Sequence, residues 1–81
     1  MIIEHFYLRK IIDLQGQVAN VAWIMLYEVI TIEINEYLTI IYNGDSYIFE
    51  EKIKCVRHYI CYYSIEVQFE SGVTFIFKRF L

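Results

Sequence analysis

The residues best suited to chemistry are two cysteines and two histidines, and three of these four lie close together in the chain. Cys55, His58 and Cys61 are spaced three apart, and thiolate and imidazole groups are ligands that zinc prefers. On a helix the three side chains could converge on one ion. We expect an extended strand here, on which His58 points away from both cysteines. We therefore predict no metal site and interpret both cysteines as buried structural residues.

The same residues bear on redox and catalytic chemistry. In one extended strand Cys55 and Cys61 would lie about 20 Å apart, which is several times the reach of a disulfide. Neither His5 nor His58 has a nucleophile at the sequence spacing of a catalytic pair, although such a pair can assemble from distant segments. A chain of 81 residues leaves little room for a pocket with an oxyanion hole. We therefore expect no enzymatic activity and no cofactor.

The elements that carry these residues are predicted to be strands. β-Branched and aromatic residues dominate the chain, and they favour extended structure. Apolar residues occupy every second position across most of residues 24–34, as in a half-buried strand. A longer strand is expected over residues 53–69. Residues 2–14 alternate less regularly, so both a strand and a short N-terminal helix are open there.

Two hairpins are predicted together with their register. Asn43-Gly44 favours a two-residue type I′ turn, because glycine and asparagine tolerate the positive φ angles that this turn needs. Glu70-Ser71-Gly72 favours a type I turn closed by a left-handed glycine. The predicted inner-face pairs are Ile40–Tyr47, Leu38–Phe49, Phe69–Val73, Val67–Phe75 and Ile65–Phe77. The sequence thus predicts one all-β domain over residues 1–81, an antiparallel meander of five to six strands forming a curved sheet or small barrel.

The composition predicts a contact surface. Hydrophobic residues make up 58% and aromatic residues 19% of the chain, whereas a domain this short buries only about 60–65% of its surface. Some apolar side chains should therefore stay exposed unless a second chain covers them, and large exposed patches mark contact sites. We expect a homodimer. The predicted contact residues are Trp23, Met25, Tyr27, Val56, His58, Ile60 and Tyr62.

A nucleic-acid partner is the alternative. Tyr59, Tyr62 and Tyr63, beside Arg57 and His58, could stack bases on a sheet, but Tyr59 and Tyr63 could equally belong to the core. The formal net charge of -3 argues against a phosphate-binding surface. Residues 14–18 are similar to the short Leu-Gln-Gly-Gln turn of Sm-like RNA-binding barrels. The family's second motif is missing from the C-terminal part, so no family is claimed.

Taken together, these features favour a small non-enzymatic protein–protein interaction module. Its short length and its preference for residues with AT-rich codons suggest a phage or mobile-element protein that inhibits a host defence protein by surface binding. The alternatives are a small nucleic-acid-binding β-barrel, OB-like or Sm-like, and a structural subunit of a viral assembly. Because no signal peptide or membrane segment is visible, we expect a cytoplasmic protein with reduced thiols.

Overall fold

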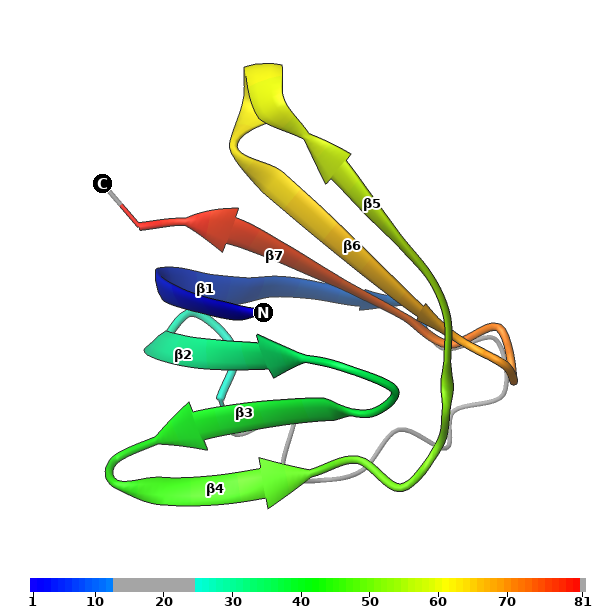
Figure 1. The fold of residues 1–81 in the computed structure, drawn as a ribbon. Coiled ribbons are helices and arrows are strands. Elements are labelled where there is room, and N and C mark those ends of the chain that lie inside the picture. The colour runs from blue at the N-terminus through cyan, green and yellow to red at the C-terminus, as the bar shows by residue number, and fades with distance from the viewer. Residues whose placement is uncertain (13–24, 81) are drawn as a thin grey trace.

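The computed structural model describes residues 1–12 and 25–80, and these residues form an open, curled antiparallel sheet (Figure 1). The elements are β1 (Ile2–Ile12), β2 (Val29–Ile34), β3 (Leu38–Tyr42), β4 (Asp45–Ile48), β5 (Ile53–Tyr59), the 3₁₀ turn η1 (Ile60–Tyr62), β6 (Ser64–Phe69) and β7 (Thr74–Arg79). The strand order is β4-β3-β2-β1-β7-β6-β5. The prediction of an all-β curved sheet is confirmed.

The curl of the sheet follows from one short connection. β4 and β5 are consecutive in the chain but occupy the two opposite edges of the sheet. In a flat sheet with strands about 4.8 Å apart, these edges would be separated by about 29 Å. Residues 49–52, which join them, can span at most about 18 Å. The sheet therefore has to curl until its edges approach each other at this link (Figure 1).

Hydrogen bonds hold the link in place. The Ile53 N–H donates to the Glu36 carbonyl at 3.1 Å, and the Glu70 N–H donates to the Lys52 carbonyl at 3.1 Å. The Lys52 ammonium also lies 2.8 Å from the Glu36 carboxylate. The side-chain hydrogen bond from Lys52 to Glu36, together with the negative charge of Glu36, raises the pKa of Lys52 above its ordinary value. The link thereby joins the β2–β3 turn to the β6–β7 turn.

A sharp bend in β1 completes the curl. The first half of β1 pairs with β2 and the second half pairs with β7, with a register break between Ile3 and Phe6. His5, inside this break, has a left-handed φ of 62°. In Figure 1 the arrows of β2 and β7 point in opposite directions, although both strands are antiparallel to β1. Residues 2–12 thus adopt the strand alternative and not the helical one.

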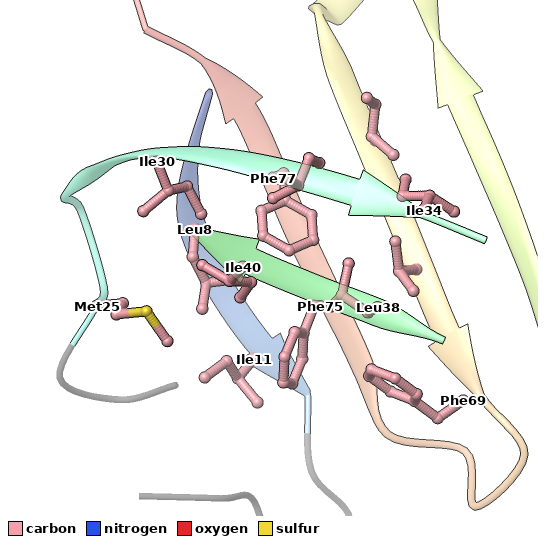
Figure 2. Close-up of a cluster of buried hydrophobic side chains, with 13 residues drawn as sticks. Leu8, Ile11, Met25, Ile30, Ile34, Leu38, Ile40, Phe69, Phe75 and Phe77 are labelled. Atoms are coloured by element: carbon pink, nitrogen blue, oxygen red, sulfur yellow. The ribbon is translucent and has the colours of Figure 1, made fainter. Parts of the chain in front are cut away.

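The core fills the space between the two halves of the curled sheet (Figure 2). Phe75 of β7 lies at its centre, with its ring centroid 5.1 Å from that of Phe69 and 5.2 Å from that of Phe49. The buried residues are Leu8, Ile11, Met25, Ile30, Ile32, Ile34, Leu38, Ile40, Ile65, Val67, Phe69, Phe75 and Phe77. Since both halves of the sheet contribute, the core secures the curl.

Both predicted hairpins are present in the predicted register. Asn43 and Gly44 have φ angles of 51° and 80°, as a type I′ turn requires. Gly72 has a φ of 96°, and the Gly72 N–H donates to the Phe69 carbonyl at 2.9 Å. The inner-face pairs Ile40–Tyr47, Val67–Phe75 and Ile65–Phe77 all form.

The prediction of one long strand over residues 53–69 is wrong. This stretch folds into a hairpin, in which β5 and β6 are joined by η1 and by Tyr63 with a left-handed φ of 49°. The connection has no glycine, proline, asparagine or aspartate, so it lacks the residues that mark turns. This hairpin brings the number of described strands to seven, compared with the five to six predicted.

The first prediction concerns the β6–β7 turn. Gly72→Ala should destabilise the fold by about 1–2 kcal/mol, because an added Cβ disfavours the left-handed conformation. The space around the glycine is open, so the loss would come from the backbone and not from a steric clash. The measurement is the free energy of unfolding in urea. Glu70→Ala, in the same turn, is the control and should change it by less than about 0.5 kcal/mol. Equal stability of both variants would contradict the assigned turn.

Candidate interaction surface

A row of cross-strand neighbours marks one end of the sheet. Tyr59 pairs with Ser64, Ser64 with Lys78, Lys78 with Tyr7, and Tyr7 with Val29. The row crosses β5, β6, β7, β1 and β2 in turn, so residues that directly flank it gather at the same end of the molecule. In Figure 1 this is the end with η1 and the last residues of β7. We call it the aromatic rim, defined as Tyr7, Tyr27, Val29, Tyr59, Ile60, Tyr62, Tyr63, Arg79 and Phe80.

Exposed apolar side chains are concentrated on this rim. The total accessible surface is 5341 Å², close to the roughly 5,200 Å² typical of a compact monomer of this mass. The amount of exposed surface is therefore ordinary. Its distribution is not, because seven of the eleven large apolar side chains exposed in the described residues belong to the rim. Ile60 is 83% exposed and Tyr62 is 70% exposed.

The structure separates the predicted contact residues into several groups. Tyr27, Ile60 and Tyr62 are exposed on the rim. Met25 is only 1% exposed and belongs to the core, so the prediction that it lies on the contact surface is wrong. Trp23 lies outside the described residues.

Val56 and His58 do not lie on the outer face predicted for them. Their partners in β6 are Val67 and Ile65, which are buried, so Val56 and His58 share the inner face of the sheet. Val56 packs against the core, whereas His58 lies at its exposed margin. The cause is the turn that ends β5. The prediction assumed one continuous strand with odd-numbered residues inward throughout, whereas the turn pairs even-numbered residues of β5 with odd-numbered residues of β6.

The same inversion places the tyrosines outside. Tyr59 pairs with Ser64 on the outer face and is 39% exposed, and Tyr63 is 53% exposed in the turn. The interpretation of Tyr59 and Tyr63 as core residues is therefore wrong. The Tyr59 hydroxyl donates to the Glu66 carboxylate at 3.4 Å, and Arg57 lies 3.9 Å from the same carboxylate. A carboxylate, paired with Arg57, thus lies beside Tyr59.

The rim contains a hollow at the bend of β1. Tyr7, Tyr27, Arg79 and Phe80 line a space of about 340 Å³. The Tyr7 ring lies 6.3 Å from that of Tyr27 and 6.2 Å from that of Phe80, the second pair meeting edge to face. A smaller hollow of about 190 Å³ lies beside η1. Tyr63 lines this second hollow. The Arg79 guanidinium lies over the Tyr63 ring, 5.5 Å from the ring centroid.

Sequence reasoning missed Tyr7, Arg79 and Phe80. No local pattern connects these residues, because they meet only through the pairing of the first and last described strands, β1 and β7. The one available signal was the alternation around Leu8, which places Tyr7 on the face opposite to the core.

In the described residues, Cys55, His58 and Cys61 do not come together as a metal-binding group. Both thiols are free, and the Cys55 thiol donates to the Gln68 side-chain oxygen at 3.4 Å. Cys55 is half-buried and Cys61 is exposed, so the expectation that both are buried is wrong. Across residues 1–12 and 25–80, no three metal-ligating side chains come together. No helix in this part of the chain is long and apolar enough to cross a membrane.

Comparisons with protein-family models, with curated proteins and with solved structures found no match for this chain. The functional argument therefore depends on the geometry of the rim.

The second prediction tests the assignment of residues 60–62 to an exposed turn. A charged thiol reagent should modify Cys61 at least tenfold faster than Cys55 in the native protein, because Cys61 is exposed whereas Cys55 is half-buried and hydrogen-bonded. In denaturant the two rates should become similar. Mass spectrometry of digested protein measures both sites, with Cys61→Ser as the control for site assignment. Faster native labelling of Cys55 would refute this placement.

Proposed function

We propose that this chain is a small protein–protein interaction module without enzymatic activity, and that it binds its partner through the aromatic rim. The observation that carries the proposal is the concentration of exposed apolar side chains at one end of an otherwise ordinary surface. Tyrosine is a common interface anchor because it combines apolar area with a hydrogen-bonding group. Ile60 and Tyr62 project from a turn, where a partner can reach them.

The proposed role is inhibition by surface binding. Phages and mobile elements use proteins that block host defence proteins. Such an inhibitor needs a complementary surface and no chemistry of its own. Its partner would be a host enzyme or complex in the cytoplasm. An interface of standard size removes about 800 Å² from each partner, and the rim crosses five of the seven described strands.

A protein partner suits the rim better than nucleic acid. The Glu66 carboxylate lies beside Arg57 and Tyr59, where it would repel a phosphate backbone. Ile60, the most exposed apolar residue of the rim, is aliphatic and offers no ring for base stacking. The net charge of -3 adds to this repulsion.

We also propose that two copies pair through the same rim to form a homodimer. A two-fold interface buries the same patch on both chains, so the dimer would cover these apolar side chains until a partner displaces one copy. A structural subunit of an assembly would instead form larger oligomers.

The third prediction tests the rim. Ile60→Glu and Tyr62→Glu should each weaken dimerisation and partner capture at least tenfold, because a buried unpaired charge is costly. The fold should be retained because both side chains are exposed. Ile48→Glu, on edge strand β4, is the matched control, since Ile48 is 67% exposed and lies outside the rim. Sedimentation measures dimerisation, and pull-down from the native host followed by mass spectrometry measures capture.

Each alternative predicts a different result. If the rim variants behave like the Ile48→Glu control, the rim is not the contact surface. Binding to single-stranded RNA or DNA that weakens as salt increases would favour a nucleic-acid-binding protein. Concentration-dependent growth beyond a dimer would favour a structural subunit.

A further inference from the structure

Strained backbone conformations surround the larger hollow of the rim. In the described part of the chain, four residues other than glycine have a positive φ: His5, Tyr27, Asn43 and Tyr63. Asn43 is accounted for by its type I′ turn. The other three are His5, in the register break of β1, Tyr63, which caps η1, and Tyr27; histidine tolerates this conformation better than tyrosine does. Such residues persist where the surrounding structure holds them, and they cluster at binding sites.

Each of these three residues positions a wall of the hollow. The His5 carbonyl accepts a hydrogen bond from the Phe80 N–H at 2.7 Å, and the Tyr63 carbonyl accepts one from the Arg79 N–H at 2.9 Å. Tyr27 lines the hollow itself, and its N–H donates to the carbonyl of a core residue of β1 at 2.9 Å. Backbone hydrogen bonds of these three residues thus fix Phe80, Arg79 and Tyr27, which line the same space.

Arg79 gives this space a positive charge. Its guanidinium lies over the Tyr63 ring, 5.5 Å from the centroid, which restricts its orientation. Within residues 1–12 and 25–80, no carboxylate lies at ion-pair distance from it. Arg57, by contrast, faces Glu66. The rim thus contains an arginine that is oriented by a ring but not neutralised by a described carboxylate.

We propose that this hollow binds an aromatic side chain with an adjacent carboxylate, supplied by a segment of the partner protein. The inference depends on the proposed protein-binding function and names the chemistry that the rim recognises. Tyr7, Tyr27 and Phe80 can surround a further ring in edge-to-face contact, and a planar guanidinium binds a carboxylate through two parallel hydrogen bonds. The volume of about 340 Å³ lies within the range of small-ligand sites. One oriented cation matches one carboxylate better than a chain of phosphates.

The experiment uses small probes and the full chain. N-acetyl-phenylalanine carries the ring and the carboxylate, and its amide carries the ring alone. In NMR titrations the acid should bind in the millimolar range and at least fivefold more tightly than the amide, with shifts at Tyr7, Tyr27 and Phe80. Arg79→Gln should reduce the affinity for the acid to that for the amide. Arg57→Gln, which removes the same charge from β5 outside the rim, should leave the fivefold preference intact.

A second variant separates binding from folding. Tyr27→Gly removes one wall of the hollow and also relieves a positive φ, which glycine accepts freely. We expect it to lose the binding of the acid at least fivefold while its urea midpoint is not lowered. A lowered midpoint with unchanged affinity would show that Tyr27 has a purely structural role and would count against the site.

Several outcomes would overturn the proposal. Equal affinity for acid and amide, or an acid affinity that Arg79→Gln does not change, would show that no carboxylate site exists. Tighter binding of a deoxythymidine decamer than of the acid, lost in Arg79→Gln, would assign the hollow to nucleic acid. Normal binding of the acid together with rim variants that still capture the partner would instead reject the proposed function and retain the site.

Discussion

The fold depends on a connection that is too short for a flat sheet. Residues 49–52 carry the chain from one edge strand to the other, so the seven strands must curl until β4 and β5 approach each other. The Lys52–Glu36 ion pair and the Glu70–Lys52 backbone bond hold this end together. The core between the two halves of the sheet then becomes continuous. The ring centroid of Phe49, in the link, lies 5.2 Å from that of Phe75.

The same constraint accounts for the contrast between the two ends of the molecule. At the link, polar residues and backbone hydrogen bonds occupy the turns. At the other end the two edge strands, β4 and β5, are not held together by such a link. There β1 bends, so that β2 and β7 run in opposite directions (Figure 1). Seven of the eleven large apolar side chains that are exposed in the described residues lie at this end. The aromatic rim and its hollow are therefore consequences of how the sheet curls as well as of which residues stand there.

Local turn chemistry made part of this fold predictable from sequence. Asn43-Gly44 and Gly72 indicated both their turns and the pairing of the flanking strands, because few residues tolerate a positive φ. The turn after Tyr59 could not be found this way, since Tyr63 adopts a left-handed conformation without being glycine, asparagine or aspartate. Because this turn was missed, the faces of Val56 and His58 were predicted the wrong way round. Tyr27, Ile60 and Tyr62 were placed correctly on the surface, but the hollow was not foreseen, because Tyr7 and Arg79 meet only through tertiary pairing.

The pairing of Phe6 with Arg79 has a consequence for biosynthesis. Among the described strands β1 is synthesised first, whereas β7, one of its two partners, is synthesised last. Until then β1 has an unpaired edge, and Leu8 lacks its neighbour Phe77. Pairings between such distant residues form slowly, and exposed strand edges invite association with other chains. The nascent chain is therefore expected to depend on chaperones, or on rapid completion of translation, more than its small size suggests.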